Sequence, residues 1–209
     1  MGGAYKQFKP GNNFRNKLKK ASKAQTEFYR ATSKEMVTDL VDFLAVTSRI
    51  RVSKKRHAYN VFTYKYVNKK ALERFVDSGA GVFYYAMNNG VINYISLCYE
   101  VGDRSYELYN GTNSFGYSNG LTGWMVMKRS ERYASLNYRY FNMGGIPHEK
   151  GDRGNLAGFK MQSGCIPKNV YIAKTDFLVY PEKAFNIFFN LGRLVPYNRF
   201  VRYLIRLME

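Results

Sequence analysis

Cysteine is scarce in this chain, and so are tryptophan, acidic side chains and long apolar segments. Cys98 and Cys165 are the only cysteines among 209 residues, too few for a disulfide framework, so we expect a reducing compartment. No apolar run approaches the roughly 18 residues that a membrane helix needs, and the N-terminus lacks the apolar segment of a secretory signal. These absences exclude a disulfide-rich secreted domain and predict a chain without a membrane partner.

Sequence motifs that carry chemistry are also missing. The chain contains no P-loop, no GxGxxG after a strand, no HExxH and no CxxC pair. His148, Glu149, Asp152 and Cys165 have the atom types of metal ligands, and Cys165 with His148 has those of a nucleophile and its base. Neither spacing matches a motif, so we expect no metal site and no nucleophile pair.

Three acids, Glu100, Asp103 and Glu107, lie close together in the sequence. They flank an expected turn, where carboxylates are usually solvated, so they do not predict the paired carboxylates of a hydrolase. With no other catalytic pattern, the sequence predicts no enzymatic activity and no cofactor.

Positive charge dominates the composition. The chain has 33 Lys and Arg against 15 Asp and Glu, a formal net charge of +18 and a pI near 9.8, which favours association with acidic surfaces or nucleic acid. Residues 1–13 form an expected basic arm, and a second basic cluster follows residue 48. The residues expected to contact a polyanion or an acidic partner are Lys6, Lys9, Lys17, Lys19, Lys20, Lys23, Arg49, Arg51, Lys54, Lys55 and Arg56. The alternative is that these side chains only keep the surface solvated.

Residues 14–48 have the pattern of one long helix. No Pro or Gly interrupts them, and Asn12 or Asn13 can cap the start. Their apolar side chains return to one helical face, at Phe14, Leu18, Ala21, Phe28, Met36, Leu40 and Phe43.

The remainder of the chain has mainly strand patterns. Residues 81–87 and 91–101 alternate with a period of two around Asn88-Asn89-Gly90, which predicts a hairpin. A segment rich in Gly and Asn, residues 110–123, is expected to be a long exposed loop. The other expected elements are strands at 59–67, 105–109, 124–128, 133–141, 159–161, 170–173 and 177–180, a second long loop at 143–158, and helices at 69–77 (capped by Asn68), 181–192 and 197–208. The predicted fold is α+β, a single domain over residues 14–209 with a long N-terminal helix, an antiparallel sheet of hairpins and C-terminal helices.

This order of elements resembles the head-tail joining and tail-completion proteins of tailed phages, the neck proteins. The resemblance covers residues 14–209 as an order of elements only, because the motif that often follows the first helix is absent, its nearest match being Leu121-Thr122-Gly123-Trp124. It implies a virion structural protein assembled in the host cytoplasm, a subunit of an oligomeric ring that contacts other copies and neighbouring structural proteins. The alternative is a ribosomal-type protein that binds RNA or DNA through its basic arm and helix.

Overall fold

A computed structural model describes residues 10–53, 68–145 and 153–168 of the chain. The chain divides into two compact units, residues 1–167 and 168–209, and all the elements described below belong to the first. Their order is α2 (Asn12–Lys23), β1 (Glu27–Ala31), α3 (Met36–Ser53), α4 (Lys69–Asp77), β2 (Gly81–Asn88), β3 (Val91–Val101), β4 (Arg104–Thr112), α5 (Ser114–Ser118), α6 (Leu121–Ser135), β5 (Tyr140–Asn142) and α7 (Arg153–Gln162).

The five strands form one sheet in sequence order, β1-β2-β3-β4-β5. The pairs from β1 to β4 are antiparallel, and β5 runs parallel to β4. The predicted β2–β3 hairpin is confirmed, and its turn uses positive φ at Asn89 (49°) and Gly90 (76°), as the favoured two-residue turn requires. The structure thus confirms a mixed fold built on a mostly antiparallel sheet.

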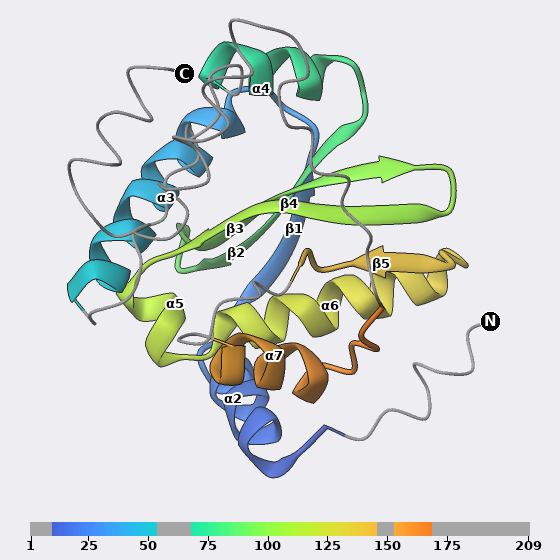
Figure 1. The fold of residues 1–209 in the computed structure, drawn as a ribbon. Helices are drawn as coiled ribbons and strands as arrows, with labels where there is room; N and C mark the ends of the chain where they lie inside the picture. The colour runs from blue at the N-terminus through green and yellow to red at the C-terminus, as the bar shows by residue number, and fades with distance from the viewer. Residues whose placement is uncertain (1–9, 54–67, 146–152, 169–209) are drawn as a thin grey trace, which may run out of the picture. The chain divides into compact units, whose positions relative to one another are not determined.

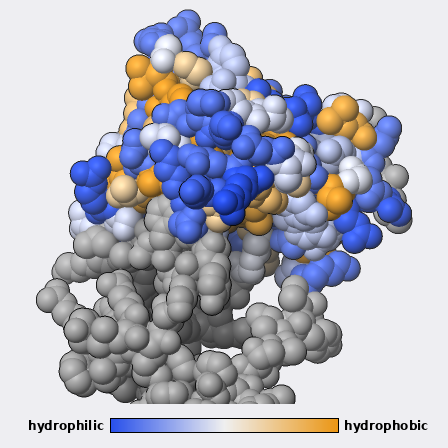
Figure 2. All heavy atoms as spheres, turned by 90° about the horizontal axis from the view of Figure 1, so that it is seen from above, coloured by the Kyte–Doolittle hydropathy of each residue, from blue (hydrophilic) through white to orange (hydrophobic). Residues whose placement is uncertain are grey.

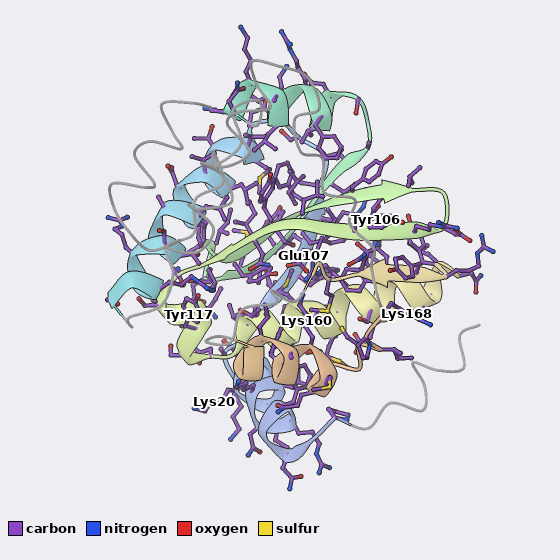
Figure 3. The ribbon with its side chains drawn as sticks, in the orientation of Figure 1. Lys20, Tyr106, Glu107, Tyr117, Lys160 and Lys168 are labelled. Atoms are coloured by element: carbon purple, nitrogen blue, oxygen red, sulfur yellow. The ribbon has the colours of Figure 1, made fainter. Side chains whose placement is uncertain are left out.

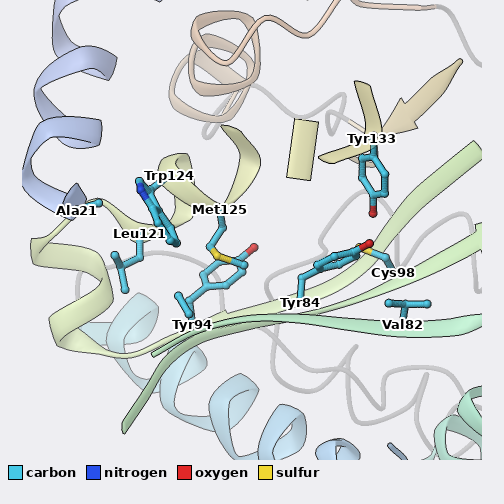
Figure 4. Close-up of a cluster of buried hydrophobic side chains, with 10 residues drawn as sticks. Ala21, Val82, Tyr84, Tyr94, Cys98, Leu121, Trp124, Met125 and Tyr133 are labelled. Carbon is cyan, nitrogen blue, oxygen red and sulfur yellow. The ribbon is translucent and has the colours of Figure 1, made fainter. Parts of the chain in front are cut away.

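Helices cover both faces of this sheet (Figure 1). On one face, α2 and α6 pack against β2 and β3 around a core of Ala21, Val82, Tyr84, Ala86, Tyr94, Cys98, Leu121, Trp124, Met125 and Tyr133 (Figure 4). On the other face, α3 and α4 pack around Val37, Leu40, Leu44, Leu72, Val76, Phe83, Ile95 and Leu97. Side chains that alternate along β2 and β3 therefore enter two cores, and both strands are almost continuously buried.

The prediction of one helix over residues 14–48 is wrong, because strand β1 lies between α2 and α3. Gln25 has a φ of 51° and ends the helical path after α2. In β1, Phe28 stacks on Tyr84 with ring centroids 5.6 Å apart, and Tyr29 stacks on Tyr85 at 5.2 Å. These cross-strand contacts with β2 decide the strand, since the spacing of apolar residues in the sequence also suits a helix.

The prediction of a loop at 110–123 followed by strands at 124–128 and 133–141 is also wrong. Residues 114–118 form α5 and residues 121–135 form α6. Leu121, Trp124, Met125 and Tyr133 lie on one face of α6 and enter the core (Figure 4). Their helical spacing was present in the sequence, but the aromatic and β-branched residues around it favoured strands.

Other expected elements have mixed outcomes. The helix at 69–77 is confirmed, and the Asn68 side chain accepts a hydrogen bond from the Ala71 amide at 2.9 Å. The strand at 105–109 is confirmed within β4. The expected loop at 143–158 and strand at 159–161 are wrong where α7 occupies them. The expected elements at 59–67, 170–173, 177–180, 181–192 and 197–208 lie outside the described residues, and the division into an arm and one domain stays a prediction.

The face of the described part that is seen from above is mostly polar. Seen from above in Figure 2, hydrophobic side chains form small separate patches among hydrophilic ones. Among the described residues, no helix is both long enough and apolar enough to span a bilayer.

Candidate functional site

The candidate site lies where strands β4 and β5 part. β5 pairs with β4 only from Arg104 to Tyr106, whereas β4 continues to Thr112. Directly after the paired residues, β4 has a bulge: Glu107 is opposite Cys98 but Tyr109 is opposite Leu97, so Leu108 has no partner on β3. Bulges re-aim side chains and end strand pairing, and they are frequent beside active sites. This one turns Glu107 toward α6.

Glu107 forms a buried ion pair with Arg129 of α6. The Arg129 Nη2 atom lies 2.6 Å from a Glu107 carboxylate oxygen, and the two side chains are 0% and 7% exposed. Burial opposes the charge of Arg129, but the Glu107 carboxylate and the neighbouring side chains of Tyr94, Cys98 and Tyr133 together outweigh it and raise the pKa of the guanidinium. The guanidinium also lies over the Phe141 ring of β5, 5.1 Å from its centroid. Arg129 therefore contacts both strands at the point where they part.

The other donor groups of Arg129 reach β3. Nη1 lies 3.3 Å from both Ser96 Oγ and Cys98 Sγ, and Nη2 donates to the Tyr94 hydroxyl at 3.4 Å. Burial raises the pKa of the Cys98 thiol to about 11 and also raises that of Tyr94. Cys98 is thus protonated near neutral pH and is not a nucleophile there.

Lys160 of α7 is the second charged group at the site. It is 7% exposed, and its ammonium donates to the carbonyls of Gly144 at 2.7 Å and Gly145 at 2.9 Å. These glycines follow β5, so Lys160 ties α7 to the chain just beyond the parting strands. Burial lowers the pKa of Lys160, and the nearby Glu107 and Cys165 side chains only partly offset this by raising it. Figure 3 shows Glu107 and Lys160 on the side of the sheet that α6 and α7 cover.

A second carboxylate, Glu100, lies in a separate hydrogen-bonded cluster. It accepts from the hydroxyls of Tyr84 at 2.5 Å and Tyr133 at 3.0 Å, and Tyr133 in turn accepts from Ser105 at 2.7 Å. Arg30 of β1 lies 3.4 Å from Glu100. Burial and the Glu100 carboxylate together raise the pKa of Tyr84 to about 12. The cluster joins four strands, β1 to β4, to α6, and we therefore assign it to the stability of the fold.

The expectation that Glu100, Asp103 and Glu107 are solvated turn charges is therefore wrong for Glu100 and Glu107. Each is held by cationic or hydroxyl groups from elements distant in the sequence. Asp103 does lie at the turn, paired with Arg139.

The segment that joins β4 to α6 is closely packed. The Asn113 side chain accepts from the Gly116 amide at 2.9 Å and donates to the Asn93 side chain at 2.8 Å. A Cβ atom at Gly116 would overlap Thr112 Oγ1 and lie 2.5 Å from the Asn93 carbonyl oxygen. This segment is anchored on the ends of β3 and β4 and is not the exposed loop that the sequence predicted.

Helix α2 packs directly on the start of α6. Gly120, the residue before α6, has a φ of 69°, and a Cβ there would lie 2.8 Å from Lys17 Cβ. A Cβ at Gly123 would lie 3.0 Å from the ring of Phe14, which is itself 1% exposed. The first turn of α6 is therefore covered by the neighbouring helix.

The structure separates the basic residues that the sequence grouped. Lys17, Lys19, Lys20 and Lys23 are exposed together on α2, whereas Arg49 and Arg51 lie on α3, which covers the other face of the sheet. The remaining expected contact residues, Lys6, Lys9, Lys54, Lys55 and Arg56, lie outside the described residues, and a contact role for the whole set stays a prediction. His148, Glu149 and Asp152 also lie outside. Elsewhere in the described ranges, no group of His, Cys, Asp and Glu could hold a metal ion.

No family model matches this sequence, and no curated protein matches it. Solved structures, however, share its fold. An aminoglycoside acetyltransferase from an uncultured soil metagenomic sample, meta-AAC0020 in complex with sisomicin, is 8% identical and has a TM-score of 0.50 over 72% of this chain and 95% of its own. A second one from such a sample, HMB0005, is 12% identical with a TM-score of 0.51 over 72% and 97%. FemX is 12% identical with a TM-score of 0.55 over 74% of this chain and 54% of its own.

The fold is similar to that of these acetyltransferases. At such low identity this likeness shows the fold alone, and it corrects the sequence analysis. The resemblance to phage neck proteins is wrong, because solved structures that share this fold are acetyltransferases. The expectations of a virion or nucleic-acid-binding structural protein, a virion location and an absence of enzymatic activity are overturned with it.

Proposed function

We propose that this chain is an acyltransferase that moves an activated acyl group onto an amino group, at the point where β4 and β5 part. The observation that carries the proposal is the early end of the β4–β5 pairing, with buried Lys160 and the Glu107–Arg129 pair beside it. The likeness of the fold to acetyltransferases, one of them in complex with an aminoglycoside, supports this class of reaction.

Lys160 is the residue we assign to the reaction. When an amine attacks an acyl carbonyl, negative charge develops on the carbonyl oxygen, and a positioned donor stabilises it. An ammonium has three N–H groups, and the carbonyls of Gly144 and Gly145 accept from two of them. The third is the donor we propose for the acyl oxygen. The new bond joins the amine nitrogen to the acyl carbon, the bond to the leaving group breaks, and the amine proton passes to solvent.

Glu107 has a different task. Its carboxylate is bound by Arg129 and by the Asn110 side-chain amide, so its oxygens are occupied by donors rather than open to an amine proton. We assign Glu107 and Arg129 to holding the bulge of β4 and the start of β5 in place.

The test is an acyl-transfer screen with the purified chain, amine acceptors and small activated esters and thioesters, followed by mass spectrometry of the acceptor. Replacing Lys160 with Met should lower the rate by about 100-fold or more, the usual cost of losing a charge-stabilising donor. The matched control is Lys128→Met, which changes a 40% exposed lysine of α6 and should leave the rate unchanged. Equal rates for the Lys160 variant and the wild type would refute the assignment.

A second candidate property is contact between α2 and a polyanion. Helix α2 carries five basic residues, Arg15, Lys17, Lys19, Lys20 and Lys23, and no acidic one. Because all four lysines are exposed on one described helix, they can meet phosphates together. We propose this surface as the place where a phosphate-bearing partner is bound.

A further inference from the structure

The fold likeness implies a cofactor that can be tested against the residues present. Acetyl transfer commonly uses acetyl-CoA, a group carrier with a pyrophosphate. A helix start after a strand is the usual cradle for such a group, because its first-turn amides have no intrahelical acceptor and attract anions. Helix α6 is the first long helix after β4, the strand that forms the candidate site, and only the five-residue helix α5 lies between them, so the start of α6 is the place to examine.

The start of α6 does not fit a pyrophosphate. Leu121 is 0% exposed and Gly123 is also buried, so the amides of two first-turn residues are inaccessible to a ligand. The Phe14 ring and the Lys17 backbone occupy the adjacent space so closely that even a Cβ atom at Gly123 or Gly120 would be crowded.

The backbone group that faces the start of α6 is a carbonyl oxygen, which repels a phosphate instead of donating a hydrogen bond to it. A Cβ atom at Gly120 would lie 3.1 Å from the carbonyl oxygen of Lys17. A phosphate here would displace α2 from its contact with α6 and approach a backbone acceptor. In the segment before α6, Gly116 is already packed against Asn93 and Thr112.

We infer that α2 replaces the cofactor phosphate at the start of α6, so this chain does not use a CoA thioester as its acyl donor. The inference rests on the proposed acyl transfer, but its first test is a binding measurement that needs no activity. Because Phe14 and Ala21 of α2 belong to the buried core, α2 is a fixed part of the fold and not a cover that opens for the cofactor.

The first measurement is calorimetric titration of the full chain with CoA and with acetyl-CoA. We expect no saturable binding up to about 1 mM ligand. Hydrogen exchange with and without CoA gives a local readout, and the amides of residues 120–124 should exchange equally in both states. Saturable binding in the micromolar range, or CoA-dependent protection of these amides, would overturn the inference.

The second measurement compares two acetyl donors. The N-acetylcysteamine thioester of acetate keeps the thioester and lacks the nucleotide and its phosphates. If α6 binds no phosphate, acetyl-CoA should react no faster than this small donor, and an advantage of about tenfold or more for acetyl-CoA would overturn the inference.

The two proposals fail separately. If no donor supports transfer and CoA does not bind, the inference on the cofactor stands and the proposed function fails. If acetyl-CoA binds and transfers acetyl, the proposed function stands and the inference fails.

Discussion

Replacing Arg129 with Met should destabilise the first unit of the chain more than any other single change at the candidate site. The substitution keeps a long unbranched side chain but removes the positive charge. Glu107 would then be left in a 7% exposed position, with the Asn110 amide as its remaining partner among those described above. Removing one member of a buried ion pair costs about 3–5 kcal/mol, because the other charge stays buried and uncompensated.

Replacing the other member of the pair, Glu107→Gln, should lower the free energy of unfolding by less. Arg129 would keep its bonds to the Met125 carbonyl, Ser96, Cys98 and Tyr94, although all of these lie at 3.3–3.4 Å. A lost hydrogen bond to a charged group is worth about 1.5–3 kcal/mol. The double variant Arg129→Met with Glu107→Gln should recover part of the loss, since no charge then remains unpaired.

Urea unfolding followed by the fluorescence of Trp124 measures these differences. Trp124 is the only tryptophan of the chain, it is 6% exposed, and it lies on α6 next to Met125 and five residues before Arg129. The urea concentration at the unfolding midpoint should be highest for the wild type, lower for Glu107→Gln and lowest for Arg129→Met. If both single variants unfolded within about 1 kcal/mol of the wild type, the pair would be behaving like a solvated surface ion pair, and our account of the site would be refuted.

Four further predictions follow from the same contacts. Gly116→Ala should cost about 1–3 kcal/mol in urea unfolding, because the added Cβ meets atoms that cannot move aside; unchanged stability would contradict the packing described. Asn68→Ala should cost about 0.5–2 kcal/mol by removing the cap of α4, whereas Asn68→Ser should cost less. Acyl transfer should fall as pH rises through the lowered pKa of Lys160, since only the charged ammonium stabilises the negative charge that develops on the acyl oxygen, and a rate that rises steadily to pH 10 would count against that role. Changing Lys17, Lys19, Lys20 and Lys23 of α2 to Gln should weaken binding to RNA or DNA and flatten its salt dependence, while Arg49→Gln on α3 should not.

Several sequence signals were sufficient because they act over a few residues. Asn89 and Gly90 accept positive φ in a two-residue turn, and Asn68 caps the helix that follows it. Both effects depend on neighbours in the chain, so no knowledge of the rest of the fold was needed.

The candidate site could not be predicted in this way. Glu107, Arg129 and Lys160 are far apart in the sequence and belong to a strand and two helices. The one available signal was the position of Arg129 four residues after Met125, on the buried face of α6. A charged residue on an apolar helical face indicates a buried partner, but the sequence around it was interpreted as strands.

The sequence by itself determined the hairpin and its turn, the Asn68 cap and the excess of positive charge, because these depend on local backbone preferences and on composition; the cap expected from Asn12 or Asn13 is wrong, since Gly11 precedes α2 and no side chain caps it. Tertiary structure alone decided that Phe28 lies in a strand, where it stacks on Tyr84, and that residues 121–135 form a helix whose apolar face covers the sheet. Helix and strand periodicities overlap over such short segments. The choice between them is made by the partners that bury the side chains, and those partners are brought together only when the chain folds.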